Sequence, residues 1–104
     1  MTKLDVMYQA IDEKKLVEVV VNTYEKGIVT RICIPFDYAL SSRAKDGKMR
    51  YHFYDLNSPN GRHNLSVLPE QLISIKVLDK TFHPEEIVTW PTNWTYKRDW
   101  GSKS

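Results

Sequence analysis

The spacing of apolar residues changes once along this chain, from a helical period to a strand period. The first segment has apolar residues at intervals of three and four, which places them on one side of a helix. Thr2 can cap this helix because Asp5 follows three residues later, and the charged run 12–15 ends the apolar pattern. The apolar positions that share this helical face are Leu4, Met7, Tyr8 and Ile11.

From residue 16 onward, apolar and polar positions alternate, as they do in strands that bury one face. Gly27 suits a tight turn after the first strand because it tolerates positive φ. Pro35 should end the second strand because proline cannot donate to a sheet ladder. In the last strand we expect Ile73, Ile75 and Val77 on the core face. The predicted strands cover residues 16–24, 28–35, 50–56, 63–68 and 72–78.

One helix followed by five short strands indicates a mainly β fold. Tight turns between consecutive strands require antiparallel pairing, and the Asn60-Gly61 pair is the strongest turn signal. Closing the sheet would protect its edges, so we predict a small five-stranded antiparallel barrel with an N-terminal helix. We divide the chain into residues 1–80, helix plus barrel, and a C-terminal extension of residues 81–104, which contains a helical turn starting at Pro84.

The composition is that of an ordinary globular domain. The chain has 104 residues, of which 41% are hydrophobic and 27% charged, and its net charge is +2. Cys33 is the single cysteine, so no intrachain disulfide can form, and its apolar neighbours favour a buried thiol. The charged N-terminus and the lack of a long apolar run predict a cytoplasmic protein without a membrane segment.

Basic residues cluster between the second and third predicted strands. Arg43, Lys45 and Lys48 lie in this basic loop, beside Arg50 and against the single acidic residue Asp46. A loop of this kind can contact phosphate or an acidic partner. The other interpretation is a solvated surface loop without a ligand.

The third predicted strand offers a candidate binding face next to this loop. If Tyr51 and Phe53 face the core, His52 and Tyr54 point outward beside Arg50. Outward aromatic rings beside cations suit base stacking with phosphate contact. The alternative is that Tyr54 packs under the helix or the tail. The candidate ligand-binding residues are Arg31, Arg50, His52, Tyr54 and Arg62. Arg31 joins from the second strand if Ile32 and Ile34 face the core, and Arg62 joins from the Asn-Gly turn.

All three tryptophans lie in the C-terminal stretch that begins at Trp90. The aromatic residues of this tail are Trp90, Trp94, Tyr96 and Trp100. Side chains this large fix a segment wherever they are buried. The tail can therefore cover a face of the barrel, dock on a second copy or another protein, or form a platform for nucleic acid with Lys97 and Arg98.

Segments of the chain resemble the WYL-domain family. The resemblance covers roughly residues 8–78 and rests on Ala10, Ile11 and Tyr24, on an arginine at position 31 with a terminal Pro35, on the aromatic strand 49–56, and on the closing strands 61–78. It implies a fold similar to SH3 and Sm barrels. It also implies a role in sensing a nucleotide-like or nucleic-acid ligand and passing that state to a regulator.

These observations favour a non-enzymatic binding module over an enzyme. The three histidines have no spacing typical of a metal site, and no common catalytic motif occurs. We expect no cofactor and no metal, and a nucleotide or single-stranded nucleic acid as ligand. The alternative is a protein-interaction or assembly module whose Trp-rich tail makes the contact, including contact with a second copy.

Overall fold

The computed structural model describes residues 1–41, 43–59 and 61–104. The chain is mainly β with an N-terminal helix, as predicted, and Asn60 of the predicted Asn-Gly turn lies outside the described residues. In chain order the elements are α1 (Lys3–Glu13), β1 (Lys15–Asn22), β2 (Ile28–Leu40), β3 (Met49–Asp55), β4 (His63–Val67), the 3₁₀ turn η1 (Pro69–Gln71), β5 (Leu72–Thr81), α2 (Pro84–Ile87) and the 3₁₀ turn η2 (Gly101–Lys103).

Helix α1 begins and ends at residues that explain its limits. The Thr2 hydroxyl accepts a hydrogen bond from the backbone N–H of Asp5, and the Asp5 carboxylate accepts one from the N–H of Thr2, both at 3.1 Å. Lys14 has a left-handed backbone, with φ of 56°, and ends the helix. The capping pair predicted from the sequence is confirmed.

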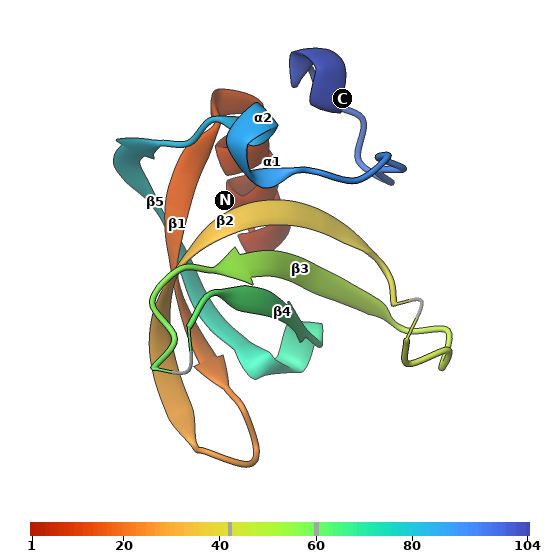
Figure 1. The fold of residues 1–104 in the computed structure, drawn as a ribbon. Coiled ribbons are helices and arrows are strands. Elements are labelled where there is room, and N and C mark those ends of the chain that lie inside the picture. Colours follow the sequence, from red (N-terminus) through yellow and green to blue (C-terminus); the bar gives the residue numbers. More distant parts are fainter. Residues whose placement is uncertain (42, 60) are drawn as a thin grey trace.

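The five strands form one antiparallel sheet in the order β4-β3-β2-β1-β5. The sheet is strongly curved, and its long central strands β1 and β2 bend around the core (Figure 1). Within residues 1–41, 43–59 and 61–104, no strand pairing joins the edge strands β4 and β5 to each other. Antiparallel pairing is therefore confirmed, whereas closure into a barrel stays a prediction.

The prediction that the second strand ends at Pro35 is wrong, because β2 continues to Leu40. Pro35 lies opposite Phe53, and the register then shifts, so that Asp37 rather than Phe36 lies opposite His52. A shift of this kind tolerates a residue without an N–H, which is why proline is found at bulges. The extension of β2 brings Phe36 and Asp37 into the sheet, where both contact the C-terminal tail.

The prediction of which residues of the last strand face the core is only partly right. Ile75 and Val77 are half-buried against the core, but Ile73 is 45% exposed and Leu72 is buried in its place. The pairing of β5 with β1 shifts between Ser74 and Leu72, which leaves Ile73 as the extra residue. A single extra residue reverses the inward and outward positions beyond it.

The core lies between α1 and the inner face of the sheet. Met7, Ala10 and Ile11 of α1 are fully buried, and so are Val17 and Val19 of β1. The tail also contributes, because Trp100 is only 2% exposed and belongs to the same cluster. Figure 1 shows α2 and the C-terminal segment lying beside α1 at one end of the sheet. None of the helices formed by the described residues has the length and apolar character needed to cross a bilayer.

Candidate ligand-binding groove

The outer face of β3 and β4 carries two of the predicted binding residues side by side with polar groups of β4. His52 lies directly opposite Ser66, and Tyr54 directly opposite Asn64. Residues that pair directly across an antiparallel ladder point to the same face. Tyr51, Phe53 and Asp55 point to the other side and are buried, so the predicted alternation of this strand is confirmed.

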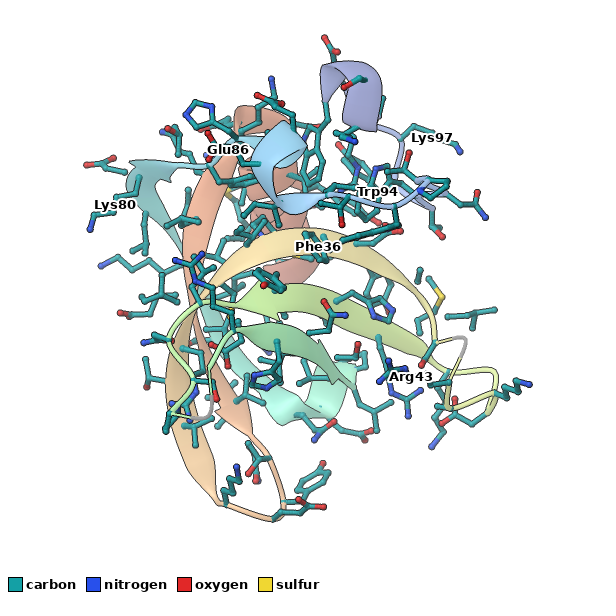
Figure 2. The ribbon with its side chains drawn as sticks, viewed as in Figure 1. Phe36, Arg43, Lys80, Glu86, Trp94 and Lys97 are labelled. Carbon is teal, nitrogen blue, oxygen red and sulfur yellow. The ribbon has the colours of Figure 1, made fainter. Side chains whose placement is uncertain are left out.

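A groove of about 660 Å³ lies over this outer face and extends from the basic loop to the tail. We call it the polar groove. It brings together three of the predicted residues, Arg43, Arg50 and His52, from a loop and a strand. Figure 2 shows Arg43 beside the loop and Phe36 on β2. The lining residues are Phe36, Ser41, Arg43, Ala44, Arg50, His52, Phe53, Asn64, Ser66 and Trp90.

Arg50 is held in place by its own loop. Its two terminal nitrogens donate to the two carboxylate oxygens of Asp46 at 3.0 and 2.9 Å. This bidentate pair, with the backbone N–H of Lys48 as a further donor, holds the pKa of the Asp46 carboxyl well below its usual range. The same partner raises the pKa of Arg50. Arg50 thus shapes the groove, but much of its charge is already neutralised.

Arg43 differs from Arg50 because it has no partner within the described part of the chain. Its side chain is exposed and lines the polar groove, and none of the described residues forms an ion pair or hydrogen bond with it. Lys45 and Lys48 are also exposed on the same loop, outside the groove lining. Arg43 is therefore the cation that can meet an anionic ligand at lowest cost, with the two lysines adding positive potential nearby.

His52 is fixed at the floor of the groove by both of its ring nitrogens. Nε2 lies 3.0 Å from the carbonyl oxygen of Ala39, and Nδ1 lies 2.8 Å from the Ser66 hydroxyl. Because a carbonyl only accepts, Nε2 carries the proton, and in the neutral ring Nδ1 accepts from the Ser66 hydroxyl. His52 thus cross-links β2, β3 and β4 and gives the groove a rigid floor.

Aromatic rings form the side of the groove nearest the tail. Trp90 packs edge-on against Phe36, with ring centroids 5.7 Å apart, yet it remains 42% exposed. Tyr54 stacks on the other side of Phe36 at 6.0 Å and does not line the groove. Tyr54 points to the outer face, as predicted, but its ring packs against Phe36 of β2 and not under the helix or the tail as the alternative had it. The ring that a ligand can reach is Trp90.

Arg31 does not join this face, contrary to the prediction. It lies directly opposite Val19, on the inner side of the sheet, and its Nε is 3.4 Å from the buried carboxylate of Asp55. The prediction placed Ile32 and Ile34 inward, but the register puts Cys33 inward, opposite Val17. The prediction assigned the isoleucines to the inner face because they are apolar. The outer face is also partly covered, however, and Ile34 is buried on it.

A smaller cavity of about 330 Å³ lies beside Arg31, lined also by Lys26 and His63. Arg62 is exposed and lines neither this cavity nor the polar groove. Among the residues that the structure describes, no three His, Cys, Asp or Glu side chains gather as metal ligands would. Burial raises the pKa of the Cys33 thiol strongly, so it is not a reactive thiolate.

The tail packs onto its own chain rather than extending into solvent. Trp100 is buried and its indole N–H donates to the carbonyl of Ile11 at 2.9 Å. Tyr96 stacks on Tyr8 with ring centroids 3.9 Å apart and donates its hydroxyl proton to Asp12. Together these contacts attach the tail to α1.

A buried arginine holds the tail against β2. The guanidinium of Arg98 lies over the rings of both Trp94 and Trp100, at 4.1 and 4.5 Å from their centroids, and the two rings pack edge-on against each other. It donates to the carbonyls of Phe36 and Tyr96 and lies 3.4 Å from the Asp37 carboxylate. Burial lowers the pKa of Arg98 to about 10, and the carboxylate of Asp37 opposes this shift.

Asp37 is satisfied in turn by the tail backbone. Its carboxylate accepts the N–H groups of Thr95 and Tyr96 at 2.7 and 3.0 Å. Asp37 belongs to the sheet because β2 continues beyond Pro35, and this position brings its carboxylate to the tail. Asp37 and Arg98 are thus the residues that fix the tail, and sequence reasoning missed this pair because 61 positions separate them.

Sequence reasoning also missed part of the groove. Asn64 and Ser66 alternate along β4 in the same phase, and the register of the β3–β4 hairpin would have placed them beside His52. Trp90 was assigned to the tail, and no sequence signal places it at the groove. No family model matches the chain, and neither the curated proteins nor the solved structures searched contain a match.

Proposed function

We propose that this chain is a binding module whose polar groove takes a ligand that carries a phosphate next to a flat ring, as a nucleotide or a single-stranded nucleic acid does. The observation that supports the proposal is that one groove contains both an exposed cation and a partly exposed aromatic ring. Arg43 is exposed without a partner among the described residues, and Trp90 presents a ring that is 42% exposed. A cation and an exposed aromatic ring are the elements of phosphate contact and base stacking.

The polar floor of the groove fits the same class of ligand. Asn64 and Ser66 supply donors and acceptors next to the fixed ring of His52. Such groups orient a ligand that has polar edges, while Phe36 and Trp90 supply apolar contact. The role that the WYL resemblance implies, sensing such a ligand and reporting it to a regulator, is part of this proposal, and so is an SH3/Sm-like barrel for the curved sheet.

An assembly role for the tail has less support. Trp94 and Trp100 contact Arg98, and Tyr96 contacts Tyr8 and Asp12, all within one chain. Among the tail aromatics this leaves Trp90 as the one with a large exposed surface, and it lies at the groove.

The test is direct binding of nucleoside monophosphates and a single-stranded hexanucleotide, measured by calorimetry at several salt concentrations. We expect the affinity to fall as salt rises, and Arg43→Ala to weaken binding by about tenfold, since a charge-assisted contact of about 1.4 kcal/mol is lost. Lys80→Ala is the matched control, because Lys80 is also exposed but lies on β5, away from Arg43 (Figure 2).

Absence of binding by every one of these ligands would contradict the proposal. So would equal losses in Arg43→Ala and Lys80→Ala, because binding would then follow the overall charge and not the groove.

A further inference from the structure

A second groove adjoins the polar groove at Trp90. It has a volume of about 630 Å³ and shares three lining residues, Phe36, His52 and Trp90, with the polar groove. We call it the apolar groove. The full set of its lining residues is Phe36, Asp37, Ala39, Leu40, Met49, His52, Trp90, Pro91, Asn93, Trp94 and Thr95.

The two grooves differ sharply in charge. The polar groove ends at Arg43 and Arg50, whereas no lysine or arginine among the described residues lines the apolar groove. Its one charged residue is Asp37, a carboxylate already engaged by Arg98 and the tail backbone. A phosphate placed there would find no lysine or arginine among the described lining residues, and its desolvation would not be compensated by an opposite charge.

The apolar groove instead offers apolar surface to an uncharged part of a ligand. Leu40 is 59% exposed at the end of β2, and Met49 lies directly opposite it on β3. The exposed Leu40 and the partly buried Met49, next to the partly exposed ring of Trp90, favour a ligand that removes these apolar side chains from water.

Building on the proposed function, we infer that the ligand has a single anionic end and an uncharged flat body, with the anionic end at Arg43 and the body packed against Trp90 and the apolar groove. A nucleoside monophosphate has this form. A nucleic-acid strand does not, because it carries a phosphate at each unit and would place one beside Asp37. Trp90 is the residue that selects the flat body, since it lines both grooves.

The first measurement is a length series. The four nucleoside 5′-monophosphates, the dinucleotides and single-stranded hexanucleotides are titrated by calorimetry into the full chain at fixed salt. We expect at least one monophosphate to bind, and its best longer counterpart to bind no more than about threefold more tightly, because added units find no complementary site. A hexanucleotide that binds more than about tenfold more tightly than every monophosphate would overturn the inference while leaving the proposed function standing.

A charge added to the apolar groove gives the second measurement. Leu40→Lys places a cation there, at a position whose exposure makes the fold tolerant of it. If an uncharged body lies in the groove, monophosphate binding weakens by about fivefold because apolar contact is lost. If a phosphate of a strand lies there, hexanucleotide binding strengthens instead, and the inference is wrong.

Ile73→Lys is the matched control for this variant. Ile73 is an exposed isoleucine on β5 and lines neither groove, so the substitution adds the same charge elsewhere. An equal change in both variants would show an effect of net charge and would overturn the assignment of the body to this groove. If no ligand of any length binds the unmodified chain, the proposed function fails and this inference falls with it.

Discussion

In two places a tryptophan of the C-terminal tail lies near an arginine, and the two places differ in burial and in hydrogen bonding. In the tail cluster, Arg98 is buried over the rings of Trp94 and Trp100, and its nitrogens donate to two carbonyls and a carboxylate. In the groove, Arg43 is exposed without a partner among the described residues, and Trp90 keeps 42% of its surface exposed.

The contrast shows that residue type alone does not distinguish a structural contact from a binding contact. An arginine whose donors are all occupied within the chain stabilises the fold and offers nothing to a ligand. An exposed arginine and a partly exposed indole contribute less to folding. Their charge and their apolar surface can instead form contacts with a ligand, and these contacts contribute to the free energy of binding. Variants that change one cluster at a time separate these two roles.

The largest effect is expected from Trp100→Ala. The side chain fills the core beside Phe82 and donates to the Ile11 carbonyl, so its loss leaves a cavity and a lost hydrogen bond. We expect the free energy of unfolding to fall by about 3–5 kcal/mol, measured by urea denaturation. Trp90→Ala is the matched variant and should lower this value clearly less than Trp100→Ala does, because 42% of Trp90 is exposed, while it abolishes ligand stacking. An equal loss of unfolding free energy in both variants would contradict the distinction between a structural and a ligand-binding tryptophan.

A smaller but still large effect is expected when the buried ion pair is broken. Asp37→Ala leaves the Arg98 charge buried without a carboxylate and should cost about 3 kcal/mol in unfolding free energy, measured by urea denaturation. The double variant with Arg98→Ala should cost clearly less than the sum of the two single variants, with a coupling above about 1 kcal/mol.

Asp46→Ala with Arg50→Ala provides the comparison in the groove region, where the pair lies on the surface. Its coupling should be clearly smaller than that of Asp37 with Arg98, because 36% of the Asp46 side chain is exposed to water, which screens the pair, whereas Asp37 and Arg98 are both buried. A coupling for Asp37 and Arg98 no larger than that of the surface pair would mean that burial does not strengthen the tail contact.

The smallest effect is expected from alkaline pH on the attachment of the tail to α1. The hydrogen bond to Asp12, together with burial, raises the pKa of Tyr96 to about 12, while Arg98 opposes the shift. A raised folded-state pKa means that the stability contributed by this group is complete below the unfolded value of about 10 and is lost as the pH rises through about 12.

The measurement is urea unfolding at neutral pH and at about pH 11, with Tyr96→Phe as the comparison. The unmodified chain should lose more stability over this interval than Tyr96→Phe, since Tyr8 and Tyr51, whose pKa values burial also raises, are common to both. The same loss in the two proteins would show that the contact with Asp12 does not couple to folding.

Part of this molecule could be predicted from local sequence. The cap formed by Thr2 and Asp5, the alternation of Tyr51 and Phe53, and the helical turn at Pro84 all depend on residues a few positions apart. The positions of Arg43, Arg50 and His52 in one groove could also be expected, because a strand and the loop that precedes it stay close together in any fold.

Local sequence could not reveal where the sheet register shifts. The shifts near Pro35 and Ile73 arise from pairing with another strand, and each reverses which side chains face inward. Arg31 was misplaced for a different reason: no register shift separates it from Cys33, but Ile34 is buried on the outer face, so the isoleucines do not mark the inner face.

The sequence by itself determined the helix, the strand segments and the basic loop, because these depend on residues a few positions apart. Only the tertiary structure decided which tryptophans are buried and which one lies open at the groove. The pairing of Asp37 with Arg98 fixes the tail on β2 and thereby places Trp90 beside Phe36. Such contacts join residues more than fifty positions apart, and it is chain folding, not local preference, that brings them together.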